Sequence, residues 1–227
     1  MYEKGVKRLL DILLCSLSLI ILSPIFLIAT IGIKLSSRGP VFYYSNRAGK
    51  DGKPFHFYKF RSMHVTDHDK KMFVADADRL FPFGSFMRRT KIDELPQLLN
   101  VIKGDMSIVG PRPMPISSVD RIYSGKYAIV KTVKPGLTSA ASLYDYTVGD
   151  TYRDDKAYQR EVLPVKLELE LYYVRHRSFP YDCQLVWRTI VTIIRVLIGK
   201  KEFKPQPELK EGNIAALIKK NSDIGGL

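Results

Sequence analysis

The chain has 227 residues, a length that suits one domain and one additional segment. Its 36 Lys and Arg exceed its 23 Asp and Glu, and the formal net charge of +13 predicts anionic partners such as lipid headgroups, phosphates or nucleic acid. The two cysteines, Cys15 and Cys183, exclude a disulfide framework and a cysteine metal site, and suit a reducing cytoplasm. The histidines lack zinc-ligand spacing, and P-loop and dinucleotide-binding glycine patterns are absent from the sequence.

The first predicted element is a long apolar helix. No residue is charged from Ile12 to Ile33, a stretch that would span about 33 Å as a helix, against about 30 Å for the hydrocarbon core of a bilayer. A single transmembrane span is the ordinary interpretation, but both flanks are basic, and the positive-inside rule places such flanks in the cytoplasm. Pro24 kinks the helix at its middle, where the Ser23 hydroxyl can hydrogen-bond a backbone group that loses its helical partner. These features favour a re-entrant helix over residues 1–35 that enters and leaves the same leaflet. The basic flanking residues are Lys4, Lys7, Arg8, Lys34, Arg38, Arg47 and Lys50.

A β-hairpin is predicted next, with strands at residues 40–44 and 55–61 and a turn at residues 49–52. The period of two places Lys59 and Arg61 on one side of the second strand, where they can clamp a phosphate. Two solvated charges at the end of a strand are the alternative interpretation.

The most informative segment is residues 88–113, in which two adjacent carboxylates, Asp93 and Glu94, lie among cations. This pattern is typical of a phosphate-handling metal site, because the acids bind a divalent ion or attack phosphorus while the cations neutralise phosphate oxygens. We expect a helix over residues 94–103, with Asp93 as its N-cap and Gly104 after its end. The dipole of that helix would keep Asp93 ionised, as a nucleophile or a metal ligand requires. Simple capping by Asp93 is the alternative. The cations are Arg88, Arg89, Lys91, Lys103 and Arg112, and the apolar face of the helix would carry Leu95, Leu98, Leu99 and Ile102.

The remainder is predicted to be mainly helical. A helix at residues 181–198 has a broad apolar face beside Arg188 and Arg195, so it can lie in a membrane interface or pack in a core. The tail after Lys204 is expected to be peripheral, with a short amphipathic piece at residues 214–219. Other helices are expected at residues 83–89, within 117–130 and at 157–175, and polar loops at residues 62–84 and 142–155.

Several motifs occur together and in order. They are Lys7-Arg8-x-x-Asp11, Ser23-Pro24, Gly39-Pro40-Val41-Phe42, Phe57-Tyr58-Lys59-Phe60-Arg61-Ser62-Met63, Asp93-Glu94-Leu95-Pro96-Gln97-Leu98-x-Asn100, Lys103-Gly104-Asp105-Met106-Ser107-x-Val109-Gly110-Pro111-Arg112-Pro113 and Pro135-Gly136-Leu137-Thr138. With these motifs, residues 4–200 resemble the bacterial sugar transferase family, the small monotopic phosphoglycosyl transferases. The pattern departs after Thr138, where many members continue with Gly and a Gln-Val-Asn-Gly-Arg-like run, so the sugar cannot be assigned by analogy.

The resemblance implies an enzyme at the cytoplasmic face of the bacterial inner membrane, in the first membrane step of glycoconjugate assembly. Such enzymes move a sugar 1-phosphate from a nucleotide diphosphate sugar, usually a UDP-sugar, to polyprenol phosphate and release UMP. Asp93 is implied as the nucleophile of a covalent phosphosugar intermediate, with Mg²⁺ near Asp93 and Glu94. Glu94 would bind the metal or deprotonate the lipid phosphate. The implied substrate-binding residues are Lys59, Arg61, Arg88 and Arg112 for phosphates, and the turn Pro111, Arg112, Pro113 for the nucleotide base.

A membrane-anchored basic binding module or scaffold without catalysis is the alternative, since charge and anchor alone would allow it. No nucleic-acid motif is present in the sequence, so anionic membrane lipids rather than nucleic acid are the expected partners of the basic surface. Magnesium dependence separates the two functions, because a pure binding module should not need the ion. We therefore expect an α+β fold: a re-entrant membrane helix at residues 1–35, a mostly helical catalytic domain with a β-hairpin and interfacial amphipathic helices at residues 36–203, and a tail at residues 204–227.

Overall fold

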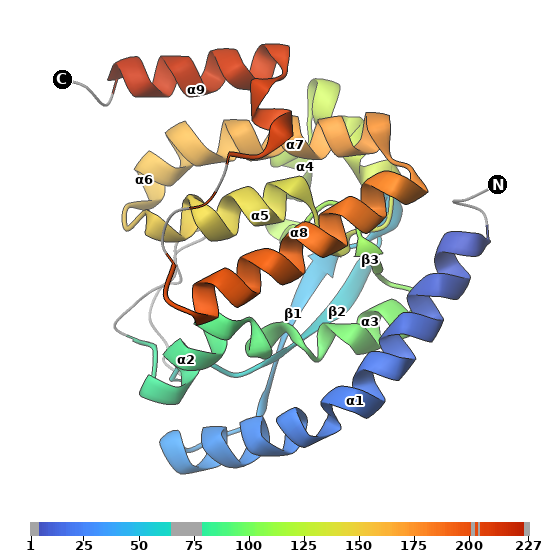
Figure 1. The fold of residues 1–227 in the computed structure, drawn as a ribbon, viewed down its shortest axis with the longest axis vertical. Coiled ribbons are helices and arrows are strands. Elements are labelled where there is room, and N and C mark those ends of the chain that lie inside the picture. The colour runs from blue at the N-terminus through green and yellow to red at the C-terminus, as the bar shows by residue number, and fades with distance from the viewer. Residues whose placement is uncertain (1–4, 65–78, 201–202, 204, 225–227) are drawn as a thin grey trace.

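The computed structural model describes residues 5–64, 79–200, 203 and 205–224. The predicted basic flank residue Lys4 and most of the loop expected at residues 62–84 lie outside the described residues. The described chain mixes α and β structure, with helices dominating, which confirms the α+β prediction at that level (Figure 1).

Helix α1 (Val6–Ser36) is the one helix of the described residues that is long and apolar enough to cross a membrane. Pro24 lies inside it and has no N–H to donate to the Ile20 carbonyl four residues back. The Ser23 hydroxyl donates to that oxygen instead, at 2.8 Å, as expected from the sequence. Figure 1 shows that α1 bends along its length. Its re-entrant placement in a bilayer stays a prediction.

The N-terminal part of α1 is fastened to the rest of the molecule by polar contacts. The Asp11 carboxylate is buried and accepts hydrogen bonds from the Ser107 hydroxyl at 2.8 Å and from the Ile108 N–H at 3.1 Å. The Arg8 guanidinium donates to the Val101 and Ile102 carbonyls at the end of α3 (Gln97–Lys103). Because these contacts come from several directions, they fix the orientation of α1 against the domain.

The predicted hairpin is present as β1 (Phe42–Ala48) and β2 (Pro54–Phe60), which pair antiparallel with Phe42 opposite Phe60. The buried Asn100 side chain of α3 joins this hairpin to α3, because its Oδ1 accepts from the Tyr58 N–H at 3.1 Å and its Nδ2 donates to the His56 carbonyl at 2.7 Å. These hydrogen bonds fix the position of β2 relative to the segment that precedes α3.

A second sheet was not predicted. It consists of two short parallel strands, β3 (Ser107–Val109) and β4 (Gly136–Thr138). Glycine is required where these strands meet, because a Cβ on Gly136 would lie 2.1 Å from the Gly110 nitrogen. The close approach brings Pro111 beside β4, and the Gly136 N–H donates to the Pro111 carbonyl at 2.8 Å.

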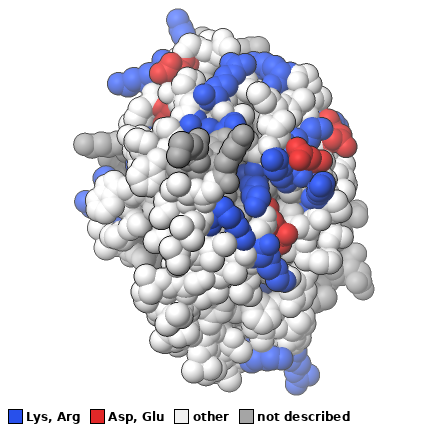
Figure 2. Space-filling model, turned by 90° about the vertical axis from the view of Figure 1, so that its right-hand side faces the viewer, with Lys and Arg blue, Asp and Glu red and all other residues white. Residues whose placement is uncertain are grey.

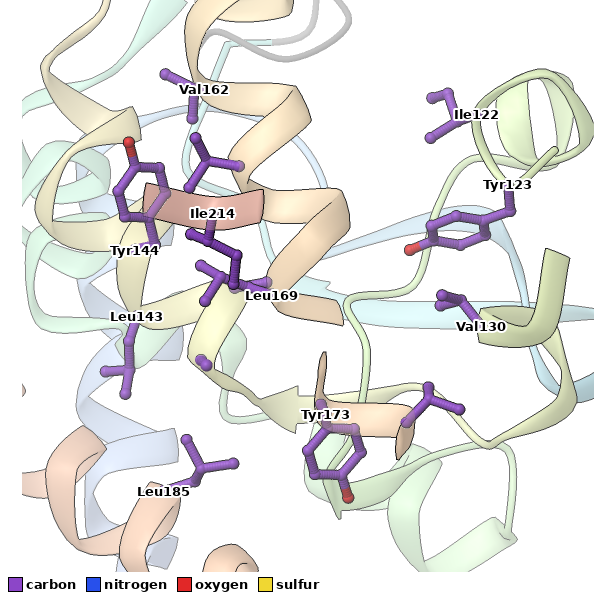
Figure 3. Packing of buried hydrophobic residues seen from close by; sticks show 14 of the residues in the cluster. Ile122, Tyr123, Val130, Leu143, Tyr144, Val162, Leu169, Tyr173, Leu185 and Ile214 are labelled. Carbon is purple, nitrogen blue, oxygen red and sulfur yellow. The ribbon is translucent and has the colours of Figure 1, made fainter. Parts of the chain in front are cut away.

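The main core forms where α5 (Ala140–Thr147), α7 (Leu163–His176) and α8 (Phe179–Leu197) pack together. Helix α5 corrects the polar loop predicted at residues 142–155. The Ser139 hydroxyl caps its N-terminus by accepting from the Ser142 N–H at 3.0 Å, and Leu143 and Tyr144 turn inward. Figure 3 shows Leu143, Tyr144, Leu169 and Leu185 converging in this core.

The segment around the paired acids also differs from the prediction. Helix α2 (Pro82–Thr90) ends at Lys91, which has a left-handed φ of 59°, and a single 3-10 turn at Ile92–Glu94 follows. Helix α3 begins only after Pro96, so Asp93 is not its N-cap. Gly104 does end α3, with φ 97°, as expected. The apolar face is also shifted, because Leu99 is exposed and Val101 is buried.

Shorter elements complete the described chain. The helix expected within residues 117–130 is α4 (Ile116–Ile122) followed by a 3-10 stretch at Gly125–Thr132. The helix expected at residues 157–175 is composite: α6 (Asp155–Ala157), a π-helical stretch at Tyr158–Val162, and then α7 with Pro164 in its first turn.

The C-terminal tail packs on the domain, although the sequence suggested a peripheral segment. A 3-10 turn at Pro207–Lys210 leads into α9 (Gly212–Ile224), which lies against α7 (Figure 1). Glu208 is buried and its carboxylate accepts from Arg188 of α8 at 2.7 Å. Ile214 enters the main core (Figure 3). The tail packs on the domain because Glu208 pairs with Arg188 and Ile214 is buried among apolar side chains.

Large apolar side chains are exposed on α1 and α8. On α8, Trp187, Ile190 and Ile194 are all about half exposed or more. On α1 the exposed residues include Leu9, Leu13, Leu17, Ile20, Ile21, Leu27 and Ile28. Figure 2 shows a broad uncharged area in the lower part of one face, with Lys or Arg at its lower edge, whereas most Lys and Arg gather above it. Such apolar faces mark an interaction surface, and for helices of this composition a membrane is the natural partner.

Candidate active site

A cavity of about 610 Å³ lies between β2, the 3-10 turn at Ile92–Glu94, α5, α7 and α8. Both paired carboxylates line it, and cationic side chains outnumber acidic ones in its wall. One border is apolar and formed by Val186, Ile190 and Ile193 of α8. The charged lining residues are Arg47, Lys59, Arg61, Arg79, Arg88, Lys91, Asp93, Glu94, Arg112, Asp145, Asp150 and Lys166.

Asp93 has an oxygen that the protein leaves without a partner. Its side chain is buried, its Oδ2 lies 3.7 Å from the Lys59 Nζ, and its Oδ1 has no hydrogen bond among the described residues. A buried carboxylate oxygen without a donor is costly in a folded protein, unless the site holds a further ligand. Asp93 is therefore poised to contact a substrate atom or a cation.

Glu94 is in the opposite situation, because two cations hold one of its oxygens. Its Oε1 accepts from the Lys59 Nζ at 2.8 Å and from an Arg112 nitrogen at 2.9 Å. Lys59 comes from β2, which Asn100 joins to α3, and Arg112 comes from the turn after β3. Three separate parts of the chain thus meet at one carboxylate.

The two carboxyls have opposite pKa directions. Burial raises the pKa of Asp93 above its ordinary value, and the Lys59 charge opposes this effect only in part. Burial also acts to raise the pKa of Glu94, but Arg112 and Lys59 outweigh it and hold that pKa well below its usual range. The expectation that a helix dipole keeps Asp93 ionised is therefore not met by the protein alone, since α3 starts beyond it.

Lys59 and Arg61, the predicted phosphate clamp, make different contacts in the structure. Lys59 reaches the acids, whereas the Arg61 guanidinium is buried and donates to the Pro40 carbonyl at 2.6 Å and to the Ser37 hydroxyl and carbonyl at 2.8 Å. Arg61 thus joins the end of α1 to the hairpin while also lining the cavity. Its binding of phosphate stays a prediction.

The Pro111-Arg112-Pro113 turn is held by a buried pair that sequence reasoning did not identify. Glu170 accepts from the Arg112 N–H at 3.2 Å, and the Tyr123 hydroxyl donates to Glu170 at 2.6 Å and to the Arg112 carbonyl at 3.3 Å. Both polar groups of the Arg112 peptide are therefore fixed. Burial raises the pKa of Glu170 to about 7. Pro113 lines the cavity, while Pro111 is buried behind it.

Of the cations predicted around the acids, Arg88, Lys91 and Arg112 line the cavity, but Arg89 and Lys103 do not. Arg47 of β1, predicted only as a basic flank, is an additional cation of the wall. Its guanidinium lies 5.5 Å over the Phe57 ring, and burial together with the Arg112 charge lowers its pKa to about 10. A signal was available in the period of two, because Arg47 pairs with Phe55 and therefore shares a face of the hairpin with Lys59.

The donor set of the site fits magnesium better than zinc. The described residues contain no group of three or more His, Cys, Asp or Glu side chains that could hold a metal ion. Asp93 and Glu94 could supply two carboxylate oxygens, and Mg²⁺ usually takes one or two carboxylates and fills its other positions with waters and substrate phosphates. The unpartnered Asp93 Oδ1 is open to such an ion or to a substrate atom.

Comparison with known proteins gives a consistent result. Residues 2–196 match the bacterial sugar transferase family. The UDP-glucose:undecaprenyl-phosphate glucose-1-phosphate transferase of Escherichia coli (strain K12) is 39% identical over 195 residues, which cover 82% of this chain and 40% of that protein. The UDP-N-acetylgalactosamine-undecaprenyl-phosphate N-acetylgalactosaminephosphotransferase of Aeromonas hydrophila is 36% identical over 193 residues, covering 83% and 44%.

A relative of similar length is also found. The uncharacterized sugar transferase EpsL of Bacillus subtilis (strain 168) is 38% identical over 199 residues, which cover 86% of this chain and 88% of that protein. The chain spans about two fifths of the length of the glucose-1-phosphate transferases from Escherichia coli and Klebsiella pneumoniae. The names of these relatives differ in the sugar that they specify.

Proposed function

The chain belongs to the bacterial sugar transferase family, and from this premise we propose that it transfers a sugar 1-phosphate from a UDP-sugar to polyprenol phosphate and releases UMP. The observation that carries the proposal is the buried carboxylate pair in a cationic cavity, with Asp93 Oδ1 unpartnered and Glu94 held by Lys59 and Arg112. The names of the relatives support the donor and acceptor classes. Products of this kind begin the assembly of a glycoconjugate.

The transfer proceeds in two displacements at one phosphorus atom. An oxygen of the Asp93 carboxylate attacks the β-phosphorus of the UDP-sugar, a P–O bond to the enzyme forms, and the bond to UMP breaks. An oxygen of polyprenol phosphate then attacks the same phosphorus and restores the free carboxylate. The covalent step lets two anionic substrates react without meeting, which removes their mutual repulsion from the transition state.

The cations of the wall suit the charge that this reaction must handle. Lys59, Arg88, Arg112 and Arg47 line the cavity around the acids and can neutralise the phosphate oxygens of the donor. Arg112 is fixed through its main chain by Glu170 and Tyr123, so its guanidinium is preorganised. Pro113, in the rigid turn, lines the same cavity and can contact the nucleotide base.

Asp93 and Glu94 are the residues that would hold Mg²⁺. When bound, the ion would supply charge neutralisation at the phosphates and would favour the ionised form of Asp93, whose pKa burial raises in the protein alone. Glu94 would bind the ion or accept the proton of the incoming lipid phosphate. Its depressed pKa keeps it ionised, which favours metal binding, and makes it a weak base for the second role.

The exposed apolar faces of α1 and α8 support a placement at the cytoplasmic face of the bacterial inner membrane, with α1 re-entrant. The Ser23 bond to the Ile20 carbonyl satisfies a backbone group that the bilayer could not. The basic surface above these faces suits anionic lipid headgroups (Figure 2).

UMP release tests the proposed function. The purified protein in nanodiscs is incubated with Mg²⁺, undecaprenyl phosphate and each of a panel of nucleotide sugars. We expect UMP and a lipid-linked diphosphate sugar from at least one UDP-sugar, and neither product from Asp93→Asn. If no donor yields UMP while the protein still binds anionic vesicles, the non-catalytic binding module is the correct reading.

A further inference from the structure

We propose that Asp145, Tyr158 and Lys166 form the subsite that binds the hydroxyl groups of the donor's sugar, and that this subsite selects a neutral sugar. The inference rests on the proposed function, because it concerns the same cavity. All three residues line that cavity and come from α5, the π-helical stretch and α7.

The three side chains form a closed triangle of hydrogen bonds. The Lys166 Nζ donates to the Asp145 Oδ2 at 2.8 Å and to the Tyr158 hydroxyl at 2.6 Å, and that hydroxyl donates to the Asp145 Oδ1 at 2.6 Å. A bound group therefore meets a preorganised set of donors and acceptors, and ordering these side chains costs nothing further on binding.

The triangle keeps hydrogen-bonding capacity for a ligand. The Lys166 ammonium has three N–H groups, of which two have partners among the described residues, and its side chain is 9% exposed. Each Asp145 oxygen accepts one bond and has a second lone pair. A sugar hydroxyl both donates and accepts, so one hydroxyl can donate to Asp145 while another accepts from Lys166.

The charges of the cavity divide it into two regions. Lys59, Arg88, Lys91 and Arg112 are the cations that act on the paired acids, where phosphates belong. At the triangle, the Lys166 charge is matched by the Asp145 carboxylate, whose pKa is lowered because Lys166 and Arg112 outweigh the effect of burial. A locally neutral, polar region suits hydroxyl groups better than another anion.

The charge balance at the triangle also determines which class of sugar can bind there. A uronic acid would bring a carboxylate against Asp145, and Lys166 is already paired with that residue. A neutral hexose or N-acetylhexosamine brings hydroxyls without this repulsion. Ser142, which lies one helical turn before Asp145 on α5 and also lines the cavity, adds a further hydroxyl group.

The test compares the binding of UDP with the binding of a UDP-sugar. The sugar is whichever of UDP-glucose, UDP-galactose, UDP-N-acetylglucosamine and UDP-N-acetylgalactosamine the unaltered protein uses with the highest kcat/KM. In Asp145→Asn and Lys166→Met, each compared in an Asp93→Asn background that cannot react with the donor, we expect the Kd of that UDP-sugar, measured by calorimetry, to rise about tenfold or more. This is the scale of a lost hydrogen bond to a charged group. The Kd of UDP should stay within about twofold.

Glu168→Gln is the matched control, because Glu168 is a buried acid of α7 paired with Lys126 and does not line the cavity. It should change neither Kd. If a triangle variant fails to fold, Tyr158→Phe, which keeps the Lys166–Asp145 ion pair, must show the same selective loss. Equal changes in the Kd of UDP and UDP-sugar, no change in either, or a higher kcat/KM of the unaltered protein for UDP-glucuronic acid would overturn the inference. Failure of the unaltered protein to release UMP would instead overturn the proposed function.

Discussion

Asp93 and Glu94 are adjacent in the sequence but have different surroundings. Glu94 is fixed by Lys59 and Arg112, whereas Asp93 keeps one oxygen without a hydrogen bond. An oxygen already bound to two cations is a weak nucleophile, and an unbonded one retains its lone pairs for attack. This difference supports attack by Asp93 and a holding role for Glu94.

Glu170 is expected to make stability depend on pH. Burial raises its pKa to about 7, so the folded protein binds a proton more tightly than the unfolded chain, and stability falls as pH rises from about 5 to about 8. Relative to Glu170→Gln, the unaltered protein should lose about 3 kcal/mol of unfolding free energy across this range, with a slope of about 1.4 kcal/mol per pH unit below pH 7 that fades above it. Chemical denaturation in detergent at several pH values measures this.

Glu168→Gln is the control for this experiment, since the pKa of Glu168 is lowered and its contribution is constant above pH 5. A Glu170→Gln difference that does not change with pH, or that changes in the opposite direction, would contradict the raised pKa. Tyr123, Lys166, Asp145 and the Arg112 N–H are the groups that set the Glu170 pKa besides burial.

Part of the site could be predicted from sequence. Asp93, Glu94, Lys59 and Arg112 belong to motifs rich in charge, and the structure brings them together. Glu170, Asp145 and Lys166 were missed as site residues, because helical periodicity shows which face a residue occupies and not which distant loop that face will meet. The rise in the pKa of Asp93 was not anticipated either, since it depends on burial by segments far along the chain.

The kink in α1 leads to a prediction about how this helix is placed in the membrane. Replacing Ser23 with Ala and Pro24 with Leu restores the N–H that Pro24 lacks, so α1 should straighten and its N-terminus should move towards the periplasm. The measurement is labelling of Tyr2→Cys, in a Cys15→Ser, Cys183→Ser background, by a thiol reagent that cannot cross the membrane.

The otherwise unaltered protein should remain unlabelled in intact cells, and the double variant should become labelled. A protein with Cys15→Ser that keeps the exposed Cys183 checks that the reagent does not reach the catalytic domain. Labelling of position 2 from the periplasm in the protein with Ser23 and Pro24 intact would show a plain transmembrane span.

Sequence patterns predicted long elements better than short ones. The hairpin and α8 have clear periods of two and 3.6 residues, and both were found. The parallel pair β3 and β4 was missed because three-residue strands show no measurable period. Helix α5 was missed because its outer residues are polar, although the Ser139 cap was visible in the sequence.

For the whole molecule, removal of divalent ions separates an enzyme from a binding module. We expect EDTA to abolish UMP release and added Mg²⁺ to restore it, because the paired carboxylates repel the donor phosphates unless a cation lies between them. Zn²⁺ should substitute poorly, since no histidine or cysteine completes a site among the described residues. Binding to anionic vesicles should survive EDTA. Full activity in EDTA would refute a role for the ion.

The covalent use of Asp93 is the central claim, and mass spectrometry tests it most directly. The protein is incubated with Mg²⁺ and its UDP-sugar in the absence of polyprenol phosphate, quenched in acid and digested. We predict one added sugar phosphate on the peptide that contains Asp93, its loss when undecaprenyl phosphate is supplied before quenching, and no adduct in Asp93→Asn, which should lack turnover while keeping the fold. Normal turnover by Asp93→Asn with no adduct on the unaltered protein would contradict the account.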